Sequence, residues 1–103
     1  MHMEKIMNEK TIEQKLCQTV AAGGGWAIKL NSTSAAGLPD RMLLMPNGIA
    51  AFVEVKAPGK KPRPLQWVQI NKLKKLGFAV FVLDDPEQIP QILKEVNDAV
   101  CSS

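Results

Sequence analysis

Three residues with side chains suited to divalent cations and phosphates lie within seventeen positions of one another: Asp40, Glu54 and Lys56. The segment Ile49–Lys56 reads as a strand, and strand side chains alternate between faces. Glu54 and Lys56 therefore share one face, roughly 6.6 Å apart along the strand. A carboxylate and an ammonium at the end of an apolar strand suggest a site, although Glu-x-Lys is also common on plain solvated strands.

Asp40 is expected close to Glu54 because the two residues flank a predicted hairpin. The Asn-Gly of Pro46–Gly48 is a strong turn signal, and both acids lie a similar number of residues from it. Adjacent carboxylates repel one another unless a proton or cation lies between them, and a divalent cation with oxygen ligands would satisfy both. Asp40 follows Pro39, so it could instead be only a turn residue.

Two neighbours of these acids could complete such a site. The backbone carbonyl of Val55 could supply one more oxygen ligand. Lys56 could orient or deprotonate a water molecule, or stabilise charge that builds on a phosphate.

Glu13 and Gln66 are polar residues beside apolar helical stripes. Glu13 shares a face with Leu16 and Val20, and Gln66 shares one with Ile70. Polar groups at such positions need partners, which a metal site between the helices and the sheet would supply. Either residue could instead lie at a boundary and reach solvent.

The elements that would position these residues follow from apolar periodicity and turn residues. Helices are predicted from about Glu9 to Ala22, from Pro64 to Gly77, and from Asp85-Pro86 to about Asn97. Strands are predicted at 26–30, 41–45, 49–55 and 78–83. The order helix, strand, strand, strand, helix, strand, helix predicts an α/β fold with a mixed four-stranded sheet flanked by helices.

The composition agrees with one domain over residues 1–103, with its core at about 9–97. The chain is 46% hydrophobic and 22% charged, and no apolar run approaches the roughly 20 residues of a membrane span. With no secretory signal at the N-terminus, we expect a cytoplasmic protein. The single histidine, His2, excludes two-histidine sites, and Cys17 and Cys101 lack metal-ligand spacing.

A basic cluster follows the acids directly. Lys60, Lys61 and Arg63 lie in a proline-rich segment of a chain whose net charge is +3, and they could contact DNA phosphates. A solvated surface loop is the alternative. Lys29 and Arg41 could add to the same basic surface. Ser34, in the small and polar loop 31–37, could hydrogen-bond a phosphate, or the loop could be a plain connection.

Four segments together resemble the virus-type replication-repair nuclease (VRR-NUC) family of the PD-(D/E)xK superfamily. They are Ile12-Glu13, Gly37–Asp40, Glu54–Lys56 and Leu65-Gln66. The similarity spans roughly residues 9–95, and the stretch 57–66 is similar to phage-borne, stand-alone members. The resemblance implies a restriction-endonuclease-like core and a phage or bacterial origin.

The resemblance also implies site residues and a substrate. Asp40, Glu54 and the Val55 carbonyl would hold Mg²⁺ or Mn²⁺, joined by Glu13 directly or through water. Lys56 would be the catalytic lysine, and Gln66 would position it or the water. Stand-alone members resemble homodimeric endonucleases acting on branched DNA, including four-way (Holliday) junctions. A non-catalytic nucleic-acid-binding module on the same fold is the alternative, and a protein-interaction domain is a third.

Overall fold

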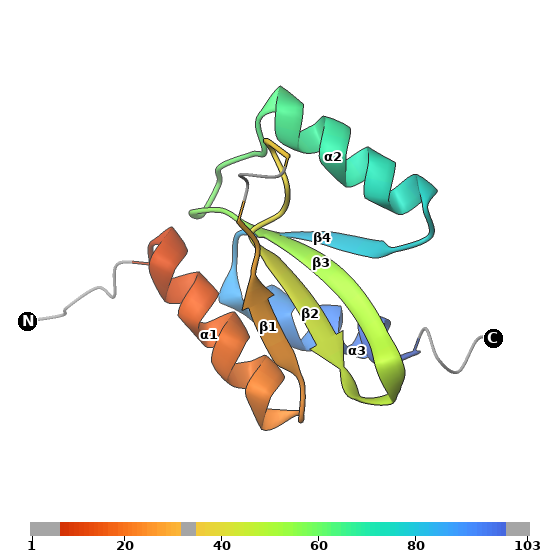
Figure 1. Ribbon diagram of the computed structural model, residues 1–103. Helices are drawn as coiled ribbons and strands as arrows, with labels where there is room; N and C mark the ends of the chain where they lie inside the picture. The colour runs from red at the N-terminus through yellow and green to blue at the C-terminus, as the bar shows by residue number, and fades with distance from the viewer. Residues whose placement is uncertain (1–6, 32–34, 99–103) are drawn as a thin grey trace, which may run out of the picture.

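The computed structural model describes residues 7–31 and 35–98. Its elements follow the order predicted from the sequence (Figure 1). The helices are α1 (Glu9–Ala22), α2 (Pro64–Lys75) and α3 (Ile89–Asp98), and short helical turns lie at Pro46–Gly48 and Pro86–Gln88. The strands are β1 (Trp26–Lys29), β2 (Arg41–Met45), β3 (Ile49–Val55) and β4 (Ala79–Leu83).

The four strands form one mixed sheet in the order β1-β2-β3-β4. β1 and β2 pair antiparallel, as do β2 and β3, whereas β3 and β4 run parallel. The mixed sheet predicted from the sequence is confirmed. The chain can cross from β3 to parallel β4 because α2 supplies the long connection that parallel strands require.

The turn between β2 and β3 fixes the register on which the site depends. Asn47 and Gly48 both adopt left-handed backbone, with φ of 72° and 78°, which is the conformation that an Asn-Gly hairpin turn needs. Met45 then pairs with Ile49, and Arg41 pairs with Val53. One step further along this register, Asp40 comes opposite Glu54.

Helices cover both faces of the sheet, so the protein has three layers. In Figure 1, α1 and α2 lie on opposite sides of the sheet. The larger core joins α1 and α3 to one face, and its buried residues include Leu16, Val53 and Ile92. The smaller core lies under α2 and contains Phe52, Ile70 and Val80. Glu54 continues the Phe52 face, which places it toward α2.

The ends of the elements differ slightly from the sequence prediction. The first strand ends at Lys29, one residue early, and the last begins at Ala79, which leaves Phe78 outside it and 41% exposed. Asp85 caps the turn at Pro86–Gln88 by accepting the Glu87 N–H at 2.9 Å, so α3 starts only at Ile89.

Several sequence predictions concern single residues. Cys17 is a free thiol that packs against the larger core. His2, Ser34 and Cys101 lie outside the described residues. Within residues 7–31 and 35–98, no helix has the length and apolar character needed to cross a bilayer. The cytoplasmic location and the single-domain extent stay predictions.

Candidate active site

Glu54 and Lys56 form a buried ion pair at the end of β3. The Glu54 side chain is 1% exposed, and its Oε2 lies 3.2 Å from Lys56 Nζ. The Lys56 backbone N–H donates to the Leu83 carbonyl at 2.8 Å, which prolongs the pairing of β3 with β4 by one residue. The Lys56 side chain is 14% exposed, so its ammonium lies close to the surface while the carboxylate lies below it.

Gln66, in the first turn of α2, is the third member of this cluster. Its Nε2 donates to Glu54 Oε2 at 2.5 Å, and its Oε1 accepts the backbone N–H of Arg63 at 2.8 Å. The second bond fixes the orientation of the amide, so the NH₂ group faces Glu54. Pro64 begins the helix in the position where proline is favoured. The start of α2 is thereby joined to the carboxylate of β3.

Asp40 reaches the same end of the sheet from the start of β2. Its Oδ2 accepts the backbone N–H of Val55 at 2.8 Å, and its backbone carbonyl accepts the Leu30 N–H at 2.8 Å. Asp40 is therefore tied to the residue that separates Glu54 from Lys56. The structure brings together Asp40, Glu54, Lys56 and Gln66, as the hairpin register and the α2 stripe predicted.

The electrostatics of the two carboxylates show that this environment disfavours their charged forms. Burial raises the pKa of Glu54, the charge of Asp40 raises it further, and Lys56 opposes both effects. Burial also raises the pKa of Asp40; the Val55 N–H opposes this, and the charge of Glu13 raises the pKa again. Each acid thus lies in the field of another, and a nearby cation would relieve the repulsion.

One atom of the cluster points to what could occupy it. Glu54 Oε1 is buried and accepts no hydrogen bond from any described residue. Buried carboxylate oxygens need partners, and this one has the chemistry of a ligand for a hard divalent cation. In the part of the chain that the structure describes, no three His, Cys, Asp or Glu side chains are arranged to hold a metal. The residues fit an ion held by two carboxylates and completed by backbone oxygen or water.

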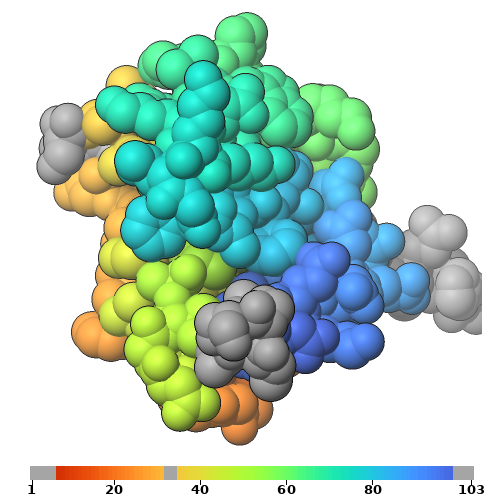
Figure 2. Space-filling view, turned by 90° about the vertical axis from the view of Figure 1, so that its right-hand side faces the viewer, coloured from red at the N-terminus to blue at the C-terminus, as the bar shows by residue number. Residues whose placement is uncertain are grey.

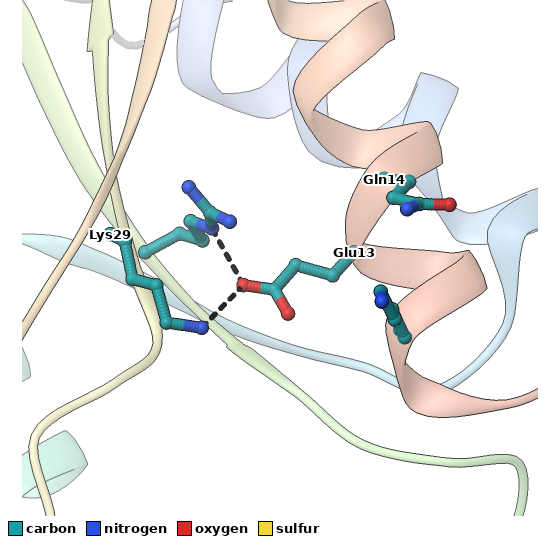
Figure 3. A pocket seen from close by; sticks show the side chains of 5 residues that line it. Glu13, Gln14 and Lys29 are labelled. Atoms are coloured by element: carbon teal, nitrogen blue, oxygen red, sulfur yellow. Dashed lines mark hydrogen bonds and ion pairs between the residues drawn. The ribbon is translucent and has the colours of Figure 1, made fainter.

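Glu13 forms ion pairs with two cations, within electrostatic reach of Asp40. Its Oε2 accepts from Arg41 Nε at 2.7 Å and lies 3.4 Å from Lys29 Nζ. Figure 3 shows the carboxylate extending from α1 toward Lys29. The sequence left a metal or solvent as the partner of Glu13 and assigned Arg41 to the basic surface; the structure pairs Glu13 with Arg41 and Lys29. The sequence could have indicated this pairing, because strand alternation puts Arg41 on the face of Leu43, toward α1.

The predicted basic segment is at the surface. Lys60, Lys61 and Arg63 are exposed, and they connect the end of β3 to α2. The Lys60 N–H donates to the Ala57 carbonyl at 3.0 Å, which closes a turn. The segment that carries these cations therefore connects Lys56 with Gln66, two residues of the site. Ser34, the fourth predicted DNA contact, falls in the part of the loop outside the described residues.

Comparisons with known proteins agree on one family. The model of the VRR-NUC domain matches residues 2–85. A protein of Acyrthosiphon pisum secondary endosymbiont phage 1, named "Putative nuclease p44", is 42% identical over 93 residues, which are 90% of this chain and 99% of that protein. A solved structure of a VRR-NUC domain is similar with a TM-score of 0.77 and 29% identity, over 84% of this chain and 94% of the other.

Proposed function

This chain belongs to the VRR-NUC family of nuclease domains, and we propose that it is a metal-dependent DNA endonuclease whose active site contains Asp40, Glu54 and Lys56. The observation that carries the proposal is the buried Glu54 carboxylate. Lys56 and Gln66 hold one of its oxygens, while the other has no partner among the described residues. A purely structural ion pair gives no reason to leave that oxygen without a partner.

The proposed cation is Mg²⁺ or Mn²⁺, held by Asp40 and Glu54 and by the backbone carbonyl of Val55. Such an ion supplies Lewis-acid chemistry toward a phosphate and lowers the pKa of a nearby water. Glu13 would join directly or through water, while its Oε2 accepts from Arg41. The Val55 N–H keeps Asp40 Oδ2 in place, which leaves Oδ1 available for the ion.

Lys56 is the proposed catalytic residue. Glu54 draws its ammonium to a fixed position at 3.2 Å, and the remaining N–H groups can donate to a phosphate oxygen as negative charge builds in the transition state. The same ammonium could orient the attacking water. Gln66 is a positioning residue, since it contacts Glu54 and the backbone of α2 rather than the substrate site.

DNA is the proposed substrate, gripped on one flank by Lys60, Lys61 and Arg63 through backbone phosphates. The proposed preference of the enzyme for branched DNA, such as four-way junctions, rests on the family resemblance alone. The test is incubation of the protein with linear, flapped, forked and four-way DNA, each with Mg²⁺, Mn²⁺ or EDTA. We expect cleavage only with a cation and fastest on a branched substrate. Cleavage of all shapes at one rate would contradict the shape preference, and binding without cleavage would favour the non-catalytic module.

A homodimer is the proposed assembly, and the outer side of α2 supports it. Figure 2 shows α2, coloured green to teal, at the surface of the molecule. Leu65, Val68 and Leu76 are 49%, 58% and 68% exposed. Leu65 and Val68 are three positions apart in α2 and share one side of it, and Leu76 caps the C-terminal end of the helix. Exposed apolar stripes of this kind mark protein contacts.

The dimer is tested by light scattering of the parent and of Val68→Asp. We expect the substitution to convert a dimer into a monomer, because it puts a charge inside the contact. Gln18→Asp, at an exposed position of α1, is the matched control and should leave the mass unchanged. A monomeric parent would overturn the dimer proposal without touching the assignment of the active site.

A further inference from the structure

A hollow between α1 and the β1–β2 edge is lined by more cationic than anionic side chains. Its volume is about 370 Å³, and it is lined by Lys10, Glu13, Gln14, Lys29 and Arg41. Figure 3 shows Glu13 and Lys29 facing each other across it. With three cationic side chains and one carboxylate, the lining keeps an excess of positive charge at neutral pH. Such a site attracts anions.

The cations of this hollow differ in how firmly they are held. Arg41 is fixed, because its Nε donates to Glu13 and its Nη1 donates to the Ala27 carbonyl at 3.1 Å. Its side chain is only 19% exposed. Lys29 is 66% exposed, and Lys10 is exposed at the rim. Glu13 occupies the deep side beside Arg41, so an incoming anion would meet the two lysine ammonium groups first.

Lys29 connects this hollow with the candidate active site. It also lines a second hollow of about 570 Å³, together with Leu30, Asn31 and Asp40. The charge of Lys29 lowers the pKa of Asp40, because the two groups lie within electrostatic reach of each other. An extended polyanion at Asp40 could therefore continue past Lys29 into the first hollow, and a DNA strand is such a ligand.

We propose that the hollow lined by Lys10 and Lys29 is a phosphate-binding subsite for the DNA strand next to the cut position. The proposal rests on the function proposed above. The subsite is a second phosphate contact, on the α1 side of the sheet. The first contact, at Lys60, Lys61 and Arg63, leads into α2 on the other side. A strand crossing the end of the sheet at Asp40 and Glu54 would then be held by phosphate contacts on both flanks of the reacting phosphate.

The test measures DNA binding rather than cleavage. The double variant Lys10→Gln/Lys29→Gln and the parent are titrated into a labelled DNA duplex in EDTA at several salt concentrations, with fluorescence anisotropy as the readout. The plot of log affinity against log salt should become shallower by about 1 for each phosphate that the variant no longer neutralises, hence by up to about 2. Lys15→Gln, at an exposed position of the same helix, is the control and should keep the parent's slope.

Further measurements separate this proposal from the one on which it rests. Thermal melting of each variant checks that the fold is kept. Lys29→Arg keeps the charge at this position, so it should bind DNA with a large part of the parent's affinity. A shallower slope in the double variant supports the subsite even if the parent never cuts DNA, in which case only the nuclease assignment fails. A double variant that keeps the parent's slope overturns the subsite whether or not the parent cuts DNA, and so does a control whose slope falls as much as that of the double variant.

Discussion

Asp40→Asn should have opposite effects on stability without and with a divalent cation. The asparagine Oδ1 can still accept the Val55 N–H, which Asp40 accepts at 2.8 Å, so the local backbone stays in place. What disappears is a negative charge that burial and Glu13 disfavour. Because the folded protein raises the pKa of Asp40, the neutral side chain should stabilise the cation-free protein, on the order of 1 kcal/mol.

A bound cation should reverse that order. An ion at about 100 times its dissociation constant stabilises the folded parent by roughly 2.7 kcal/mol. In a domain of about this size, that gain raises the melting temperature by roughly 10 °C. The variant has only one of the two carboxylate ligands and should gain little. In EDTA the variant should therefore melt above the parent, and in excess Mg²⁺ or Mn²⁺ it should melt below.

The assay is thermal unfolding followed by circular dichroism, repeated over pH without cation. Since the pKa of Asp40 is raised above 3.8 in the folded state, the folded protein holds this proton more tightly than the unfolded chain. The parent should lose stability as the pH rises from 3.8 through the raised pKa, and its difference from the variant should vanish toward acidic pH. A parent that equals the variant at neutral pH and shows no response to either cation would refute the shared carboxylate site.

Three further outcomes follow from particular contacts. Gln66→Leu removes the donor to the buried Glu54 and the acceptor for Arg63, and urea unfolding should show a loss of about 2–4 kcal/mol; a loss below about 0.5 kcal/mol would contradict this role. Gly37→Ala adds a Cβ at 2.9 Å from the Leu65 carbonyl oxygen and at φ of +84°, which should cost about 1–3 kcal/mol in the same assay, and an unchanged midpoint would disprove the close contact. Lys60→Gln with Lys61→Gln should weaken DNA binding and flatten its salt dependence by about 1 per lysine; an unaltered slope would exclude phosphate contact there.

The hairpin is the part of the site that the sequence predicts best. Asn47-Gly48 selects a turn geometry, and the turn determines the register. The register then brings Asp40 opposite Glu54 without further information. Alternation along β3 likewise separates Glu54 and Phe52 from Val53, and the two cores confirm that separation. Local rules of this kind depend only on neighbours in the chain, so one sequence is enough to apply them.

Contacts between separate elements were harder to predict. Helical periodicity showed that Glu13 lies beside the core stripe, but the identity of its partner depends on how α1 lies across β1 and β2. That packing puts Arg41 and Lys29 against its carboxylate. In the same way, the α2 stripe placed Gln66 near the sheet, whereas its bond to the Arg63 N–H depends on where the helix begins. Pairings of this kind are set by packing, which pattern and spacing do not encode.

The most direct test of the central claim compares DNA cleavage by the parent and by Lys56→Ala. Lys56→Ala leaves Glu54 without its cation, but burial already raises the pKa of Glu54, so the carboxyl can take up a proton; the fold and DNA binding should stay in place, which melting and anisotropy can verify. With Mg²⁺ or Mn²⁺ present, we expect the parent to cut DNA. Lys56→Ala should cut it at least roughly 100-fold more slowly, which is the order expected for loss of transition-state charge stabilisation. Equal cutting rates for the two proteins would contradict the assignment of this site.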